Sequence, residues 1–546
     1  MAKSTSRPEA AMSDGAKVLS QPLGGSALAL AVQADVTPAG WYAPRPRGPA
    51  EWRAHAETVR GSVGTDWLNA LHDALFDERS VPTSPAYRRL AASGIGRGIV
   101  ITTGQQPGLF GGPIYTWSKA LSALALADEI EAASGVPAAP VFWAATDDAD
   151  FTEASVTHIA VPGGVETLAL STHGVRMGAS MSDVPLREAG ALLRRLERAA
   201  GSATYPRALS VVREAYEDGA TIGSAYVALL RALLEPLGIA VLDASHRSVR
   251  AAARPMMVRA LTEAARVEEA LLSRDEALRV AGYEPQVALV AGLSLVFRAG
   301  KGIGARERVP IGEAAKWAAQ AEVADLGPNV LLRPIVERSI LPVAGYVAGP
   351  AELAYFAQVG AVAVALGAPV PTSLPRWSSL IVEPHVQRIL DRYSLSADDL
   401  RDPHAAEARL ARETIPRAGE EALRAARDAA AERVEALRGA LATPPEGLLS
   451  PPVLDGLARD LQFRLDRLER RVVAAAKRKH SQVMRDVATA RGALFPAGKP
   501  QERALNFLPL LARNGPTLLD TMLARAREHA TSLVTLGSGA PIGSDQ

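Results

Sequence analysis

Two polar clusters in the first third of the chain combine residue types that can do chemistry. The first is a glycine-rich segment, residues 103–119, with four glycines and two prolines. Its candidate site residues are Gly104, Gln105, Gln106, Tyr115 and Lys119. Backbone N–H groups of such a loop can face an anion, and glutamine amides suit an uncharged sugar or a carboxylate. The same pattern is also typical of a tight turn that buries its glutamines.

The second cluster is acidic and comprises Asp147, Asp148 and Asp150. Crowded carboxylates raise one another's pKa and bind hard cations, so this cluster could hold Mg²⁺ or accept a proton from an amine. Acidic residues that follow a strand are equally often helix caps. Both interpretations stay open at this stage.

The surrounding pattern predicts which elements position these clusters. Residues 98–103 form a short β-branched run, residues 115–130 are rich in helix-forming Ala and Leu, and residues 140–143 begin a second apolar strand. In a parallel α/β sheet, ligands bind beyond the carboxyl ends of the strands. Both polar clusters fall at such ends, so we predict one binding site there.

Later segments add candidates for the same site. Arg333 and Arg376 each lie beside a proline at the end of an apolar segment, where a guanidinium group could clamp a carboxylate through two hydrogen bonds. A predicted strand at residues 340–347 is followed by a turn and a helix. That turn and helix contain Gly349, Pro350, Glu352 and Tyr355. The basic segment 301–306 with Arg308 is typical of a solvated hairpin turn, or could close over phosphates.

Composition excludes several classes of function. The chain has 546 residues, 60 Lys and Arg against 59 Asp and Glu, and no cysteine. We therefore expect two or three structural units, no nucleic-acid partner, and neither disulfides nor a thioester on the protein. No apolar run approaches a membrane span, so we expect a cytoplasmic protein that binds no membrane. Histidine spacing does not predict zinc, and the glycine loop matches neither the dinucleotide nor the P-loop pattern. NAD, flavin and haem are not expected.

The predicted fold class is α/β, a Rossmann-like, doubly wound parallel sheet with inserted connecting segments and a C-terminal antiparallel α-helical coiled coil. We expect a disordered tail at 1–25, a catalytic core at 26–402, a coiled-coil hairpin at 403–492 and a helical segment at 493–546 that returns to the core. Within the core, short apolar runs at 287–290 and 293–298 predict a hairpin insertion near 283–308. Leucines and alanines spaced by three and four in 423–475 make a seam, which predicts a homodimer through the coiled coil. The alternative is that the seam packs only on its own chain.

Several long motifs resemble one family over nearly the whole chain. Residues 103–115 read T-G-Q-Q-P-G-L-F-G-G-P-I-Y, and residues 140–151 read P-V-F-W-A-A-T-D-D-A-D-F. Together with 328–334, 341–355, 375–376 and 501–507, they are similar to the bacillithiol biosynthesis cysteine-adding enzymes. Relatives commonly have a histidine in the acidic motif, where this chain has Ala149.

The resemblance implies a ligase that adds L-cysteine to glucosaminyl malate by amide formation, with ATP or ADP and Mg²⁺ as expected cofactors. Asp147, Asp148, Asp150 and Lys119 are then catalytic candidates. It also adds Trp143 to the substrate-binding residues and implies nucleotide contacts by Arg503 and Asn506. The order of motifs is similar to the nucleotidyl-transferase core of class I aminoacyl-tRNA synthetases, which favours an adenylate by analogy.

Two alternatives remain. One is a non-catalytic or repurposed dimeric ligand-binding relative, which Ala149 keeps open. The other is a ligase that attaches cysteine or another amino acid to a different amino sugar, because recognition of a neutral sugar has no fixed residue spacing.

Overall fold

The computed structural model describes residues 15–77, 80–94, 96–176, 178–299, 306–402, 404–442 and 448–536. The chain divides into two units. Unit 1 comprises Met1–Ile159, Thr167–Val382 and Gln501–Gln546, and unit 2 comprises Ala160–Glu166 and Glu383–Pro500. The expected boundary at residue 402 was therefore placed too late. The reason is that helix α16, Pro384–Arg392, packs on helix α20, Ser481–Leu494, and so belongs to unit 2.

A five-stranded parallel sheet forms the centre of unit 1, in the order β11-β10-β2-β3-β6. The strands are β2 Ile99–Gln105, β3 Ala138–Ala144, β6 Ala240–Asp243, β10 Val343–Ala348 and β11 Ser373–Pro375. The chain adds β3 and β6 on one side of β2 and then returns to add β10 and β11 on the other. This is the doubly wound order, and it reverses direction between β2 and β10. The Rossmann-like prediction is confirmed.

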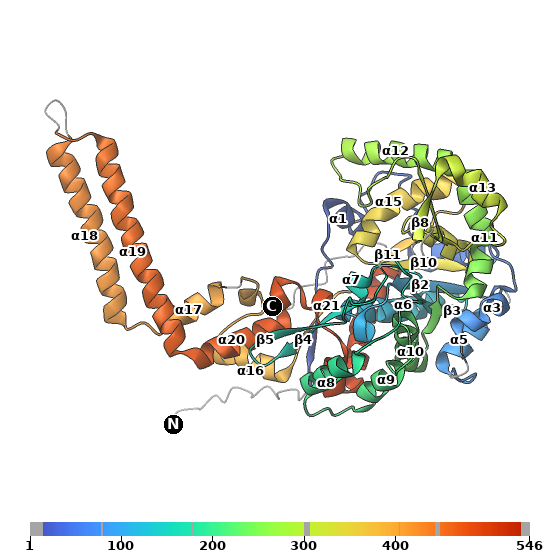
Figure 1. Cartoon of the computed structure of the whole chain (residues 1–546), viewed down its shortest axis with the longest axis horizontal. Coiled ribbons are helices and arrows are strands. Elements are labelled where there is room, and N and C mark those ends of the chain that lie inside the picture. The colour runs from blue at the N-terminus through green and yellow to red at the C-terminus, as the bar shows by residue number, and fades with distance from the viewer. Residues whose placement is uncertain are drawn as a thin grey trace, which may run out of the picture. The chain divides into compact units, whose positions relative to one another are not determined.

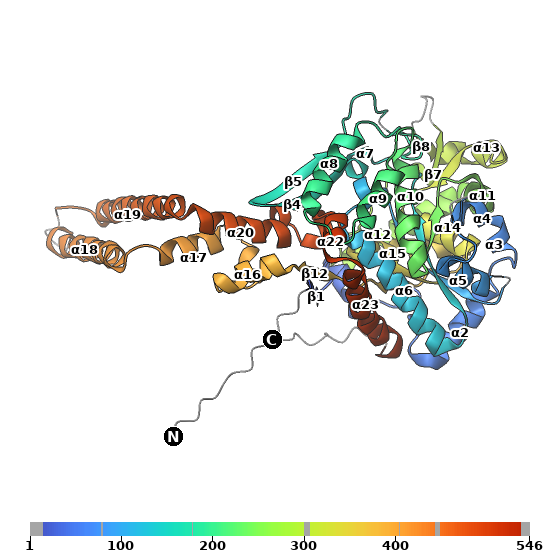
Figure 2. The ribbon, with the colours of Figure 1, turned by 90° about the horizontal axis from the view of Figure 1, so that it is seen from below.

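Helices cover the sheet because its strands are apolar on both faces, as in β3, where every residue is buried. Helix α6 Ile114–Ser134 links β2 to β3 and packs on both strands, on α2 Gly48–Arg60 and on α23 Pro516–Leu536. Figure 2 shows α6 and α23 lying beside each other. Within the described ranges, no helix is both long enough and apolar enough to cross a bilayer.

The remaining elements of unit 1 connect and cover this sheet. The N-terminal helices are α1 Ala27–Gln33, α3 Trp67–Ala70, α4 His72–Leu75 and α5 Pro85–Ser93. The middle of the chain adds α7 Phe151–Ala154, α8 Ala189–Ala200, α9 Arg207–Ala215, α10 Ile222–Leu234, α11 Arg247–Thr262, α12 Ala264–Val280, α13 Ala314–Ala319, α14 Arg333–Ile340 and α15 Pro350–Ala365. Strands β4 Val156–Val161 and β5 Gly164–Ala169 are divided between the units, because residues 160–166 belong to unit 2. The C-terminal elements are α21 Gln501–Ala504, α22 Leu508–Asn514 and α23.

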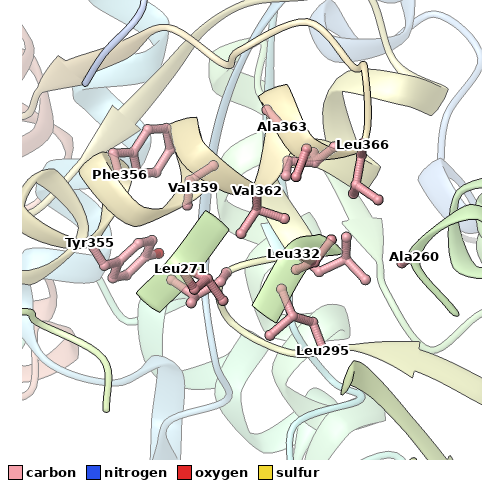
Figure 3. Close-up of a cluster of buried hydrophobic side chains, with 14 of the residues drawn as sticks. Ala260, Leu271, Leu295, Leu332, Tyr355, Phe356, Val359, Val362, Ala363 and Leu366 are labelled. Carbon is pink, nitrogen blue, oxygen red and sulfur yellow. The ribbon is translucent and has the colours of Figure 1, made fainter. Parts of the chain in front are cut away.

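The largest apolar core lies around α15, which follows β10. Tyr355, Phe356 and Val362 of this helix pack with Leu271 of α12 and with Leu332, as Figure 3 shows. Because α15 is buried along most of its length, its N-terminus is held rigidly at the carboxyl end of β10. This core therefore fixes one wall of the site described below.

The insertion predicted near residues 283–308 contains a hairpin, but a different one. Strand β7 Leu293–Ala299 pairs antiparallel with β8 Arg306–Pro310 and with β9 Leu326–Pro328. The predicted strand at 287–290 is wrong, because the buried Gln358 side chain binds both the N–H and the C=O of Val287 and so takes the place of a partner strand. Most of the basic segment 301–306 lies outside the described residues.

The expected disordered tail is wrong at its C-terminal end. Strand β1 Lys17–Ser20 pairs antiparallel with β12 Ser379–Val382, so an edge strand satisfies the backbone groups of this polar segment. Residues 1–14 lie outside the described residues.

Unit 2 is helical and contains the coiled coil. Its helices are α16 Pro384–Arg392, α17 Ala405–Glu413, α18 Arg417–Leu441, α19 Pro451–Lys479 and α20 Ser481–Leu494. Helices α18 and α19 lie side by side in Figure 1. Arg427 pairs with Asp466 and Arg438 with Asp455, each at 2.7 Å, so residue numbers rise along one helix as they fall along its partner. The predicted antiparallel coiled coil is confirmed.

Candidate active site

A cavity of about 500 Å³ lies at the carboxyl ends of β2, β3 and β10, where the strand order reverses. Doubly wound sheets bind ligands at this point because the loops on either side diverge. The structure brings fourteen of the predicted site residues to this cavity. They are Gly104, Gln105, Gln106, Tyr115, Lys119, Asp147, Asp148, Arg333, Gly349, Pro350, Glu352, Tyr355, Arg376 and Arg503.

A buried ion pair occupies the floor of the cavity. The Nζ atom of Lys119, on α6, lies 2.7 Å from Oε2 of Glu352, on α15, and the Lys119 side chain is only 3% exposed. Lys119 also donates to the carbonyl of Gly104 at 2.5 Å. Glu352 accepts from the Gly349 N–H and the Tyr346 hydroxyl, each at 2.7 Å. Helix α15 therefore begins with its first-turn glutamate folded back on its own N-terminus.

Burial and pairing set the charges of this pair. Burial lowers the pKa of Lys119 against the opposing effect of Glu352. Burial would raise the pKa of Glu352, but Lys119 and the Gly349 N–H together hold that pKa below its ordinary value. Glu352 is consequently a fixed anion, and Lys119 is a cation with an internal partner.

Arg333 lies beside this pair and faces the cavity from the first residue of α14. Its Nη2 atom is 3.4 Å from the hydroxyls of both Tyr346 and Tyr355 and 4.0 Å from Glu352. On its other side, Nε is 3.6 Å from Glu337, one helical turn along α14. The pattern of an arginine followed four residues later by a glutamate could have identified Glu337 from sequence.

Arg376 was predicted to clamp a substrate carboxylate, but its donors already have a partner. Its guanidinium group makes two hydrogen bonds to Glu502, at 2.6 and 2.9 Å, and a third to the carbonyl of Trp377. Both charged side chains are more than nine-tenths buried. Arg376 thus lines the cavity as half of an internal ion pair, which corrects its predicted role. Glu502 belongs to a motif that the sequence singled out, although not for this pairing.

The acidic cluster separates into three different environments. Asp147 faces Arg306, whose guanidinium donates to the Asp147 carbonyl and lies 3.5 Å from its carboxylate. Asp148 lines the cavity and accepts the Asp150 N–H at 2.9 Å, and burial raises its pKa. Asp150 does not line the cavity and instead caps α7 through the Glu153 N–H at 3.0 Å. The helix-cap interpretation is therefore the right one for Asp150.

A hydrogen-bonded chain crosses the opposite wall. Gln105 donates its amide to the Tyr115 hydroxyl at 3.0 Å, and this hydroxyl donates to Glu153 at 3.3 Å. Partial burial, with Asp150 nearby, raises the pKa of Glu153. Glu153 was missed from sequence, where its position three residues after Asp150 marks it only as part of a helix start.

The glycine-rich loop does not cradle an anion along its length. Beyond Gln106 it turns into the core, where the Phe110 N–H donates to the Tyr216 hydroxyl at 2.8 Å. The Asn506 amide nitrogen lies 3.0 Å from the Phe110 carbonyl and also contacts those of Leu109 and Gly112. Asn506 is 2% exposed and does not line the cavity. Its predicted nucleotide contact is therefore replaced by a structural role.

Trp143 was also predicted to bind substrate, but it does not line this cavity. Its side chain lies in a core cluster with Val141 and Leu242 and borders a separate cavity of about 70 Å³. Trp143 pairs in register with Gly104, and a Cβ atom at Gly104 would lie 3.3 Å from the Cβ of Trp143, so the two positions share one face of the sheet.

Cofactor binding at this cavity has limited support from its side chains. Within the described residues, no three His, Asp or Glu side chains form a group that could hold a metal ion. Among the cavity cations, Arg503 is exposed and has no hydrogen bond or ion pair to any described residue. Arg503 thus has donors free for a phosphate, and among the described residues Asp148 and Glu153 are cavity carboxylates without a cationic partner at hydrogen-bond distance.

Comparison with known proteins agrees with this architecture. The family model "Bacillithiol biosynthesis BshC, N-terminal Rossmann-like domain" matches residues 89–377, and the corresponding C-terminal coiled-coil domain model matches residues 379–534. A "Putative cysteine ligase BshC" of Solibacter usitatus (strain Ellin6076) is 32% identical over 83% of this chain and 87% of that protein. A protein of the same description from Koribacter versatilis (strain Ellin345) is 31% identical over 78% of this chain and 81% of its own. The chain therefore belongs to the bacillithiol biosynthesis BshC family.

Proposed function

We propose that this chain is a ligase that joins the carboxyl group of L-cysteine to the amino group of glucosaminyl malate. The observation that carries the proposal is that one cavity at the switch point is lined by both guanidinium groups and carboxylates. Arg333 and Arg503 offer guanidinium donors to carboxylates, and Asp148 and Glu153 offer carboxylates to an amine. The names of the family relatives support a cysteine ligase.

The reaction removes water from a carboxylate and an ammonium group, so the carboxylate must first be activated. ATP would supply that activation by converting the carboxylate to an adenylate with release of pyrophosphate, or to an acyl phosphate with release of ADP, and attack by the amine would then expel AMP or phosphate. Arg503 is the residue we expect to contact the phosphates of ATP. The remaining requirement falls on the protein itself. The amine must lose a proton before it attacks, and a carboxylate with a raised pKa is a better acceptor for that proton.

Asp148 is our candidate for the proton acceptor. It lines the cavity, burial raises its pKa, and the described residues that line the cavity include no histidine. Ala149 stands where the resemblance to the family leads us to expect an imidazole, so we propose that a carboxylate takes that role. Lys119 would offset negative charge that develops near Gly104, while Glu352 keeps it in position.

The test compares two isosteric variants of adjacent acids. Purified protein is incubated with cysteine, glucosaminyl malate, ATP and Mg²⁺, and the amide product is measured by mass spectrometry. Asp148→Asn should lower the rate about 100-fold or more, the usual effect of removing a general base. Asp150→Asn, in the cap outside the cavity, should retain the rate within a few-fold. Equal losses in both variants would contradict the assignment.

Ala149 favours a second candidate, a ligand-binding relative that does not catalyse ligation. This candidate predicts that the folded wild-type protein yields no product while cysteine or glucosaminyl malate still binds by calorimetry. Product from amino sugars that lack the malate group would instead indicate a ligase with another acceptor.

A further inference from the structure

Glu337 is a buried acid next to the cavity that the proposed reaction does not use. It lies on α14, four residues after Arg333, and is 1% exposed. Neither of its carboxylate oxygens makes a hydrogen bond of good geometry to any described residue, although the Thr102 hydroxyl is close enough to lower its pKa. Arg333 Nε, which lies 3.6 Å from Oε1, likewise makes none. A carboxylate buried in this way has little to stabilise its negative charge.

Arg333 is shared between Glu337 and the cavity. Its Nε side faces Glu337, whereas its Nη2 atom faces the two tyrosine hydroxyls on the cavity side. An anion that binds Arg333 from the cavity would therefore compete with Glu337 for the same positive charge. Protonation of Glu337 would remove that competition, because the neutral acid no longer forms an ion pair with the guanidinium group.

The balance of charges around Arg333 also favours protonation of Glu337 when an anion binds. The groups that act on Glu337 or are acted on by it are Arg333 on α14, Thr102 on β2, Lys119 on α6, Glu352 and Tyr355 on α15, and Tyr346 on β10. Lys119 and Arg333 carry two positive charges, and Glu352 carries one negative charge. With Glu337 ionised the group is neutral. With Glu337 protonated it carries one positive charge, which matches one incoming carboxylate.

The acid is also poised to change its charge. Burial raises the pKa of Glu337 to about 7, although Arg333, Thr102 and Lys119 lower it. Glu352, by contrast, has a lowered pKa and stays ionised. A modest change in nearby charge near neutral pH thus changes the protonation of Glu337 and leaves Glu352 unaffected.

We propose that Glu337 is a positioning residue for Arg333 and that it takes up a proton from solvent when an anionic ligand binds in the cavity. The ligand class is a carboxylate, and in the proposed function it is the malate group of the acceptor. The proposal rests on that function only for the identity of the ligand. Proton uptake itself follows from the placement of Glu337, Arg333 and the cavity.

The experiment measures protons taken up on binding, with L-malate as the probe. Isothermal titration calorimetry near pH 7 in two buffers of different ionisation enthalpy gives the number of protons bound with each ligand. Wild type should take up about half a proton per malate, because half of the free Glu337 is already protonated at a pH equal to its pKa. Its affinity should fall up to about tenfold per pH unit above pH 7.

Two variants make the result specific. Glu337→Gln should bind malate with no proton uptake and with an affinity that no longer falls above pH 7. Glu235→Gln is the matched control, because Glu235 is also buried and also has a raised pKa, but its neighbours are Ser80 and Arg231 and not Arg333. It should behave as wild type. Circular dichroism would confirm that each variant is folded.

The infrared carbonyl band of a protonated carboxylic acid gives a second readout. Above pH 8 this band should be weak in free wild type, grow when malate binds, and be absent from the Glu337→Gln difference spectrum. A purely structural role for Glu337 would not produce this change.

Failure of the inference can be distinguished from failure of the ligase proposal. Proton uptake that persists in Glu337→Gln, absence of uptake in wild type, or absence of malate binding would each overturn the inference. If the wild type forms product without proton uptake, the ligase proposal is supported and the proposal for Glu337 is overturned. If proton uptake occurs without product, the proposal for Glu337 is supported and the ligase proposal is overturned.

Discussion

The ion pair on the cavity floor should matter as much for stability as for chemistry, and Glu352→Gln tests this. The substitution preserves shape and leaves an acceptor for the Gly349 N–H, but removes the charge 2.7 Å from Lys119. Lys119 would then be a buried cation without its paired anion, beside Arg333, whose remaining acidic neighbour is Glu337. Breaking a buried pair by removing one partner typically costs about 3–5 kcal/mol, and we expect a value near 3 kcal/mol because Lys119 keeps the Gly104 carbonyl.

The reverse substitution, Lys119→Met, should cost less. Glu352 would retain the Gly349 N–H and the Tyr346 hydroxyl, and Arg333 is already 4.0 Å away. The double variant should recover about 2 kcal/mol relative to the sum of the single losses, because it leaves neither charge unpaired.

Urea unfolding of the single and double variants, followed by intrinsic tryptophan fluorescence, gives these free energies. Glu153→Gln is the matched control, since Glu153 is an exposed acid at the same cavity and should lose under about 1 kcal/mol. The reasoning would be refuted if Glu352→Gln cost no more than this control, or if the two single losses were simply additive.

Three further predictions follow from individual side chains. Asn506→Ala should lower the free energy of unfolding by about 2–4 kcal/mol in urea titrations, because it leaves buried carbonyls of the glycine-rich loop and the Leu508 N–H without partners. In wild type, the stability associated with a protonated Glu337 is present below about pH 4.5 and is lost as pH rises to about 7, a total of about 3 kcal/mol. Glu337→Gln should flatten that part of the stability profile, and an unchanged slope would count against the raised pKa. The exposed apolar side chains Phe463 and Leu468 of α19 should lie in a homodimer interface. Replacing both with glutamate should therefore convert a dimer to a monomer, as measured by light scattering. A wild type that is already monomeric would contradict this prediction.

The place of the site was predictable from sequence because it follows from topology. A β-branched run before the glycine loop and a second apolar strand before the acidic cluster predict two parallel strands. Parallel strands bring their carboxyl ends to one edge, and Gln105 and Asp148 are found there. This inference needs only local periodicity, and for that reason it held.

Side-chain partners were not predictable, because they come from distant parts of the chain. Arg376 looks like an open carboxylate clamp until the fold brings Glu502 to it. Asp148 and Asp150 look equivalent in sequence, but only one of them faces the cavity, since Asp150 turns back to cap α7. Tryptophan is a residue type that often binds ligands, yet the pleat of β3 directs the Trp143 side chain into the core. Local pattern does not determine any of these outcomes.

The pairing of charges around the cavity constrains how a ligand can bind there. Lys119 is balanced by Glu352, Arg376 by Glu502 and Arg306 by Asp147, so most of the guanidinium and ammonium charge is already compensated inside the protein. A reactant that brings net charge must therefore either bind at Arg503 or change the protonation of a neighbour.

Glu337 is the neighbour best placed to change. The negative charge of Glu337 is stabilised by Arg333, the same cation that would bind the ligand. Glu352 and Glu502, by contrast, each have a fixed partner at hydrogen-bond distance. A cavity built in this way selects reactants whose charges are balanced as they bind. It follows that alanine substitutions at its charged residues would confound folding with chemistry, and that charge-neutral isosteres are the informative variants for this site.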